Sequence, residues 1–158
     1  MAAVDLSEAP ASFHAQYAAK WKVYEYRVLN SKQRSPLEDS RAYRFPYALN
    51  ITAMKKAAKQ FIGKHDFRAF ESSGARRASA LRTIQTFEIK KQKKIILFLV
   101  KADGFLYKMV RSMAGTLLEI GSGKKAPELI QKMLMSQDRR LVGPTVPAHG
   151  LTLKKVYY

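Results

Sequence analysis

In some segments of this chain apolar residues recur at every second position, and in others at every third or fourth position. The order of these segments limits the folds that the chain can adopt. Residues 20–29 are rich in aromatic and β-branched side chains and alternate with a period of two, which predicts a strand with Tyr24 and Tyr26 on one face. Residues 82–90 and 94–101 predict a hairpin across a lysine-rich turn, and residues 151–157 predict a last strand. The chain therefore needs a sheet.

Between these strands, apolar residues recur at helical spacing and predict three helices. The first spans residues 52–63, the second spans residues 106–120, and the third begins with Pro127 in its first turn. Three residues are expected on the side of the second helix that faces away from its apolar stripe: Lys108, Arg111 and Gly115. Mixed strands and helices with a hairpin indicate an α+β fold, with a mostly antiparallel sheet and helices packed on one face.

The length of the chain allows one domain with a hydrophobic core. Its 158 residues are too few for two comfortable domains. Residues 1–12 are small, polar and unpatterned, so we expect a flexible segment there and a single domain over residues 13–158. Two loops are expected within it, a long one over residues 30–50 and a mobile basic one over residues 71–80.

Positive charge is the main indication of a binding partner. Twenty-nine Lys and Arg residues stand against twelve Asp and Glu residues, a net charge of +17, which favours a polyanionic partner. The charge is spread along the chain rather than gathered in one amphipathic helix, which favours nucleic acid over a membrane surface. Lys55 and Lys59, on the polar face of the first helix, are candidates to contact an RNA backbone.

Other classes of function are excluded by what the chain lacks. It contains no cysteine, which excludes disulfides, thiolate metal sites and a cysteine nucleophile. Its three histidines have no carboxylates at ligand spacing, so we expect no metal. The longest apolar run is residues 95–100, too short to span a bilayer, and the acidic N-terminus does not resemble a signal peptide. We expect a cytoplasmic protein with no membrane partner.

Four segments carry more specific information. They are Phe13-His-Ala with Tyr24-Glu-Tyr; Gly63-Lys-His-Asp-Phe; Phe105-Leu-Tyr-Lys-Met-Val-Arg111 with Gly115-Thr-Leu-Leu-Glu-Ile-Gly; and Asp138-Arg-Arg with Gly143-Pro-Thr and Pro147-Ala-His-Gly-Leu. Each is weak or moderate alone, and the third and fourth together are specific. In this order and spacing they resemble the TruA family of tRNA pseudouridine synthases, over nearly the whole chain from Phe13.

The resemblance implies an enzyme that isomerises uridine to pseudouridine in the anticodon stem-loop of tRNA, at positions 38 to 40 of the tRNA. Such an enzyme uses no cofactor, acts as a homodimer and extrudes the target base from its helix. The family's nucleophile is an aspartate in a Gly-Arg-Thr-Asp-Ala-Gly motif, and none of the five aspartates of this chain has those neighbours. The chain thus resembles the C-terminal half only, and we expect it to be inactive alone.

The resemblance also implies roles for individual residues. Arg111 would pair with the missing nucleophilic aspartate, and Tyr24 would lie against the target uracil. His14 and Lys108 are tentative RNA contacts, together with the two lysines of the first helix. Family members usually carry arginine after Phe-His-Ala, whereas Gln16 follows here, so the RNA contact of that arginine is not expected.

Two alternatives remain. A non-catalytic basic RNA-binding module would bind tRNA in a salt-sensitive way without modifying it. A basic structural protein of the ribosomal type would explain the charge, but it would give Arg111 no more importance than Lys93. Restoring the N-terminal half and testing Arg111→Ala and Tyr24→Phe separates these functions.

Overall fold

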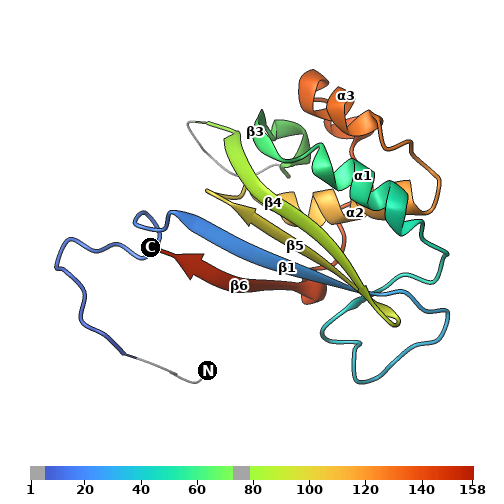
Figure 1. Ribbon diagram of the computed structural model, residues 1–158, viewed down its shortest axis with the longest axis horizontal. Coiled ribbons are helices and arrows are strands. Elements are labelled where there is room, and N and C mark those ends of the chain that lie inside the picture. Colours follow the sequence, from blue (N-terminus) through green and yellow to red (C-terminus); the bar gives the residue numbers. More distant parts are fainter. Residues whose placement is uncertain (1–5, 73–78) are drawn as a thin grey trace.

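Three helices cover one face of a single sheet in the part of the chain that the structure describes (Figure 1). This computed structural model describes residues 6–72 and 79–158. The predicted α+β class, with a mostly antiparallel sheet and helices on one face, is confirmed. Most of the basic loop predicted over residues 71–80 lies outside the described residues.

The sheet is organised around its first strand. Its described strands are β1 (Trp21–Leu29), β2 (Tyr43–Arg44), β3 (Gly63–Asp66), β4 (Leu81–Gln92), β5 (Ile95–Ala102) and β6 (Leu151–Tyr157). β5 pairs antiparallel with β1 on one side, followed by β4 and β3. On its other side β1 pairs antiparallel with β6 and, at its end, parallel with β2. The predicted hairpin is confirmed as β4–β5, and its turn contains Lys93 at a φ of 54°.

The helices begin and end close to their predicted positions. They are α1 (Ile51–Lys59), α2 (Met109–Gly121) and α3 (Leu129–Ser136). The predicted start of α2 was three residues too early, because Lys108 has a φ of 60° and a left-handed residue cannot continue a right-handed helix. The first helix was predicted to extend to residue 63, but α1 ends at Lys59, and Gly63 begins β3 with a φ of 111°.

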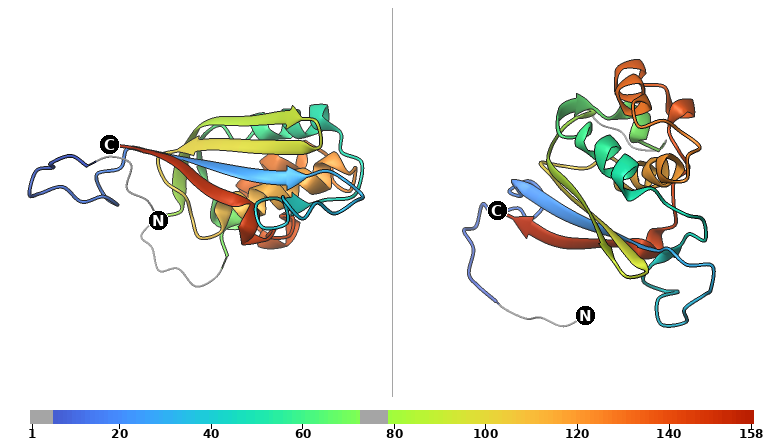
Figure 2. Two further views of the ribbon diagram at one scale, coloured as in Figure 1. Left: turned by 90° about the horizontal axis from the view of Figure 1, so that it is seen from below. Right: turned by 45° about the vertical axis from the view of Figure 1, so that its right-hand side comes forward.

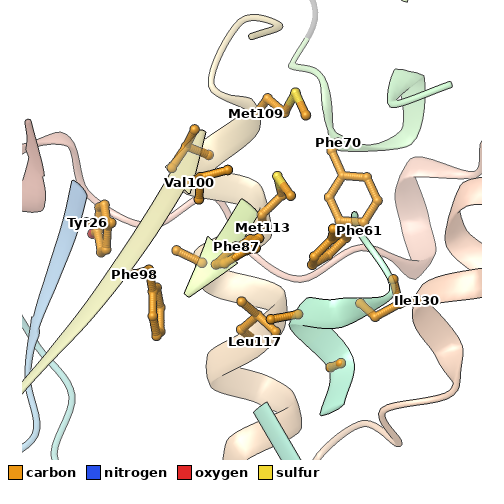
Figure 3. Packing of buried hydrophobic residues seen from close by; sticks show 14 of the residues in the cluster. Tyr26, Phe61, Phe70, Phe87, Phe98, Val100, Met109, Met113, Leu117 and Ile130 are labelled. Atoms are coloured by element: carbon orange, nitrogen blue, oxygen red, sulfur yellow. The ribbon is translucent and has the colours of Figure 1, made fainter. Parts of the chain in front are cut away.

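The core lies between the sheet and the helices (Figure 3). Tyr26 and Phe98, from β1 and β5, face Met113 and Leu117 of α2, and all four are fully buried. A second aromatic group joins the end of α1 to the segment after β3, where the rings of Phe61 and Phe70 meet edge to face with centroids 5.1 Å apart. This packing holds α2 rigidly across the sheet.

The two faces of β1 have different surroundings. Tyr24, Tyr26 and Val28 point toward the helices, as the period of two predicts, and the last two are fully buried. The alternate residues, among them Trp21 and Val23, therefore lie on the opposite face. All three described helices lie on one side of the sheet, so the opposite face of β1, β5 and β6 is free of described helices (Figure 2).

Candidate active site

A hollow of about 260 Å³ opens where the start of α2 meets β1 and β6. It is lined by Tyr24, Phe105, Leu106, Tyr107, Lys108, Met109, Val110 and Leu151. Most of these side chains are apolar or aromatic, with one lysine among them. A concave, mostly apolar site with few polar groups suits a flat organic ring such as a base.

Tyr24 forms one wall of this hollow. It lies on the helix-facing side of β1, between Val100 of β5 and Leu153 of β6 in the sheet register. Its ring meets the ring of Phe105 edge to face, with centroids 5.0 Å apart and an interplanar angle of 87°. This contact fixes the plane of the tyrosine, because edge-to-face aromatic pairs hold both rings in a defined orientation. The sequence reasoning quoted Phe105 within a motif but assigned it no role.

Lys108 brings a positive charge to the same hollow. Its left-handed backbone ends the preceding loop immediately before α2, and its Nζ lies 4.8 Å from the centroid of the Tyr107 ring. The ammonium group is therefore held beside an aromatic ring at the rim. The structure thus brings together two of the predicted site residues, Tyr24 and Lys108, around one hollow.

Arg111 lies beside the hollow and is not one of the residues that line it. It follows Val110 in α2, is partly buried rather than fully solvated, and donates from Nε to the carbonyl oxygen of Val146 at 2.7 Å. That bond uses the inner nitrogen of the guanidinium. The two outer nitrogens make no further hydrogen bond or ion pair with the described residues. They are free to bind a carboxylate in a two-point geometry.

The electrostatic neighbour of Arg111 within the protein is Tyr26. The Tyr26 hydroxyl donates to the carbonyl oxygen of Pro147 at 2.8 Å. Burial raises the pKa of Tyr26 well above its ordinary value, Tyr43 raises it further, and the positive charge of Arg111 opposes both. Tyr24 lies two residues before Tyr26 on the same face of β1, so Arg111 and Tyr24 lie on the same side of the sheet. Among the described residues, no hydrogen bond or cation–π contact joins the two side chains.

The segment over residues 142–150 holds Arg111 in place, and Gly115 makes this possible. A Cβ on Gly115 would stand only 1.8 Å from the carbonyl oxygen of Pro144. The prediction that Gly115 faces away from the buried side of α2 is therefore wrong: the residue is buried beneath this segment. The apolar stripe alone could not reveal this, because the contact comes from a segment about thirty residues later in the chain.

Hydrogen bonds secure the segment on both sides of this contact. The amide of Gly143 donates to Thr116 Oγ1 at 3.0 Å, and that hydroxyl donates to the carbonyl oxygen of Ser112 at 2.8 Å. Thr145 Oγ1 lies 3.1 Å from Ser112 Oγ and accepts from Arg139 at 2.9 Å. Sequence reasoning missed this support. The only signal in the sequence was that Thr116 and Gly143 both lie in the segments that resemble the family.

The remaining predicted residues lie elsewhere. His14 is exposed in the segment before β1, and its Nδ1 accepts from the backbone amides of Gln16 and Tyr17. Lys55 and Lys59 project from α1 over a separate hollow of about 320 Å³, whose floor includes Phe87 of β4. They form a basic rim there, away from the residues that line the Tyr24 hollow.

A larger polar hollow of about 380 Å³ lies under the loop after β1, and three of its charged side chains, Glu25, Arg27 and Glu38, make ion pairs. The carboxylate of Glu25 accepts from Lys154 Nζ at 2.7 Å, and Arg27 donates to Glu38 at 3.3 Å. We assign it no chemistry. Among the described residues, no helix combines the length and apolarity that a membrane crossing needs. In the same part of the chain, no group of three or more His, Cys, Asp or Glu side chains could hold a metal ion.

Comparison with known proteins identifies the relatives of this chain. The profile of a family described as tRNA pseudouridine synthase matches residues 57–158, more than half of the chain. The tRNA pseudouridine synthase A 2 of Clostridium perfringens is 41% identical over 155 residues, which cover 98% of this chain and 64% of the relative. The tRNA pseudouridine synthase A of Acetivibrio thermocellus is 42% identical over 151 residues, covering 96% of this chain and 62% of that protein.

A third relative, the tRNA pseudouridine synthase A of a Thermoanaerobacter species, is 44% identical over 147 residues, or 93% of this chain and 60% of the relative. The chain thus spans a little under two thirds of the length of the curated relatives it matches. The resemblance seen in the motifs is confirmed by both comparisons. This chain belongs to the tRNA pseudouridine synthase family.

Proposed function

We propose that this chain forms one side of the active site of a tRNA pseudouridine synthase that acts on the anticodon stem-loop. The observation that carries the proposal is the state of Arg111. Its Nε is held by Val146, while its outer nitrogens lack a partner among the described residues, beside a hollow that contains Tyr24. A cation held in this way suits a carboxylate that the chain itself does not place there.

Arg111 would pair with the nucleophilic aspartate of a Gly-Arg-Thr-Asp-Ala-Gly motif. A guanidinium binds a carboxylate through two parallel hydrogen bonds and keeps it ionised, as a nucleophile must be. In the isomerisation, the bond between N1 of uracil and C1′ of ribose breaks, and a bond between C5 and C1′ forms. The proton on C5 is lost and a proton is gained at N1, so the product has the composition of the substrate.

Tyr24 would hold the everted uracil. The hollow offers the ring and hydroxyl of Tyr24 on one wall and apolar side chains such as Val110 and Leu151 on others. An apolar cavity favours a flat base over water, and the hydroxyl can accept or donate a proton near C5. Removal of the base from its helix costs a few kcal/mol, which contacts inside the pocket must offset.

The basic side chains would bind the phosphates of the tRNA. Lys108 lies at the rim of the Tyr24 hollow, and Lys55 and Lys59 line the hollow beside α1. With His14, these residues are the proposed RNA contacts. The net charge of +17 supports a polyanion. It also supports the second candidate, a non-catalytic basic RNA-binding module, which requires no role for Arg111.

The tRNA named for the relatives agrees with these proposed contacts. We further propose that the complete enzyme works in the cytoplasm as a homodimer.

The test restores the missing carboxylate. The part of the Clostridium perfringens relative that this chain does not match, in which we expect the aspartate motif, is fused ahead of this chain. Pseudouridine formation is then measured on unmodified tRNA by mass spectrometry. We expect the fusion to be active and the chain alone to be inactive. Arg111→Ala and Tyr24→Phe should each lower kcat on the order of 100-fold or more, a size typical of a lost charge or proton-transfer group.

A matched control is available in Arg34, which has a side chain 77% exposed and lies on the loop after β1. Arg34→Ala should leave kcat within about twofold, as most exposed substitutions do. If Arg111→Ala behaves like Arg34→Ala in an active fusion, the catalytic role is wrong. If the chain alone and every fusion bind tRNA but form no pseudouridine, the RNA-binding module is favoured.

A further inference from the structure

Aromatic and lysine side chains gather on the sheet face that the helices leave open. The start of β1 and the end of β6 lie side by side there (Figures 1 and 2). Trp21 pairs with Tyr157 across these strands, and Val23 pairs with Lys155 of β6 and with Lys101 of β5. Cross-strand partners share a face, so these side chains form one surface opposite Tyr24. We name Trp21, Lys101, Lys155 and Tyr157 the aromatic-lysine patch.

The lysines of this patch are held over its rings. Lys101 Nζ lies 5.6 Å from the centroid of Trp21 and 4.7 Å from the centroid of Tyr157. Lys155 Nζ lies 4.6 Å from the same tyrosine ring. Two ammonium groups thus share one exposed aromatic ring, and Lys101 bridges two rings. Such contacts at exposed sites are weak enough for a phosphate to draw the ammonium group toward itself.

The patch remains open to ligands. Tyr157 is 36% exposed and Lys155 is exposed, while Trp21 and Lys101 are partly exposed. The next residue, Tyr158, is 54% exposed and meets the ring of Phe13 edge to face at 4.9 Å. No acidic side chain forms an ion pair with the two patch lysines among the described residues. Their charge is therefore not neutralised within the patch.

We propose that the aromatic-lysine patch is a second RNA site, which binds unpaired nucleotides by stacking bases on Trp21 and Tyr157 while Lys101 and Lys155 contact the phosphates. Proteins that bind single strands combine aromatic faces with a basic track, because every base has a π-face and every nucleotide a charge. The site lies on the sheet face opposite the Tyr24 hollow and needs no catalytic partner for Arg111. It would hold a part of the RNA other than the target uridine.

Stacking distinguishes this proposal from other partners. An anionic membrane or an acidic protein would use the lysines, but neither supplies flat bases to lie on the rings. A second copy of the chain brings no bases, and the same surface on it would add further lysines rather than the anionic groups that the patch lysines can bind. Single-stranded RNA is the polyanion that satisfies both features of the patch, and the overall charge of +17 favours it further.

The chain contains its own reporter for this site, because Trp21 is its single tryptophan. The purified chain is titrated at low salt with an oligouridine of about eight nucleotides, within the site sizes of single-strand binders, while Trp21 emission is recorded. We expect saturable quenching that weakens as salt rises. Inorganic polyphosphate of the same charge has no bases, so it should compete weakly and leave the emission nearly unchanged.

Variants separate stacking from charge. Tyr157→Leu and Lys101→Gln should each weaken oligouridine binding on the order of 10-fold, whereas Tyr157→Phe keeps the ring and should bind almost normally. Lys93→Gln at the hairpin tip is the matched control for a lost lysine. Circular dichroism and thermal unfolding establish that each variant is folded. The affinities of Tyr157→Phe and Tyr157→Leu are compared only when both variants are folded.

Three outcomes would overturn the proposal. Polyphosphate could quench Trp21 as strongly as oligouridine, which would leave charge alone as the cause. Oligouridine could bind with no change in Trp21 emission and with equal affinity for Tyr157→Leu, which would place binding elsewhere. Vesicles of anionic lipid could shift the emission where oligouridine does not. None of these results bears on Arg111, so this site and the proposed catalytic site can fail separately.

Discussion

Replacing Gly115 with alanine would place a methyl group against the backbone of another segment. The added Cβ would stand 1.8 Å from the carbonyl oxygen of Pro144, whereas ordinary contacts begin near 3.4 Å. The segment would have to move by roughly 1.6 Å to restore normal van der Waals separation. A backbone carbonyl cannot rotate away as a side chain can, so the segment over residues 142–146 must lift from α2.

The cost can be worked out from these contacts. Overpacking of this kind costs about 1–3 kcal/mol, and the buried amide of Gly143 would lose its bond to Thr116, for about another 1–3 kcal/mol. Alanine regains about 1 kcal/mol of helix propensity over glycine. We expect Gly115→Ala to lower the free energy of unfolding by about 3 kcal/mol, or roughly 6–12 °C in Tm for a domain of this size.

Gly121→Ala in the same helix is the matched control. Its Cβ would also stand too close to its neighbours, at 2.5 Å from Sδ of Met54 and 2.8 Å from Cδ2 of Leu49, but both atoms belong to side chains, which can shift without moving the backbone. Urea unfolding should therefore show a smaller loss there, about 1 kcal/mol, the low end for overpacking, and hydrogen exchange at the Gly143 amide should accelerate only in Gly115→Ala. Equal stability of the two variants would refute the tight seating of the segment on α2.

Three further predictions concern Tyr26, Thr116 and the start of α1. Tyr26→Phe removes the donor to Pro147 and should cost about 1–2 kcal/mol at pH 7 by urea unfolding. Burial raises the pKa of Tyr26, so the contribution of the Tyr26 hydroxyl to the free energy of unfolding is complete below pH ~10 and is lost as pH rises further. The difference in stability between wild type and Tyr26→Phe should therefore narrow between about pH 10 and 11.5. A constant difference would contradict the burial of the hydroxyl. Thr116→Val keeps the shape but leaves the Gly143 amide unpaired, and should cost about 1–3 kcal/mol, with Thr116→Ser recovering most of it. Asn50→Ala removes the side chain that accepts from the Ala53 amide at the start of α1 and should cost about 1 kcal/mol, whereas Asn50→Asp should retain the cap.

The two proposed RNA sites divide the sheet between them. Tyr24 and Trp21 belong to the same strand, three residues apart, yet they face opposite sides. Helix packing shapes the hollow on the Tyr24 side, while the Trp21 side remains open for an extended strand of RNA. A period of two in one strand is therefore enough to present two surfaces of different character.

The sequence by itself determined the elements and the family. Side-chain alternation in β1, the lysine-rich turn between β4 and β5 and the apolar stripe of α2 are local properties, so their period and turn chemistry can be read without the rest of the chain. The motifs around Arg111 and Pro147 carried the family resemblance because they are short and contiguous. The apolar pattern predicted the start of α2 too early, because Lys108 adopts a left-handed backbone conformation that a lysine in the sequence does not predict.

Only the tertiary structure decided how distant segments meet. Gly115 is buried by Pro144, Arg111 is held by Val146, and Lys101 lies between Trp21 and Tyr157, each pair separated by many residues in the chain. Periodicity within one element cannot show which other element will cover it. Such contacts arise when packing brings the segments together, and they determine which arginine is fixed, which glycine is indispensable and which aromatic face stays open.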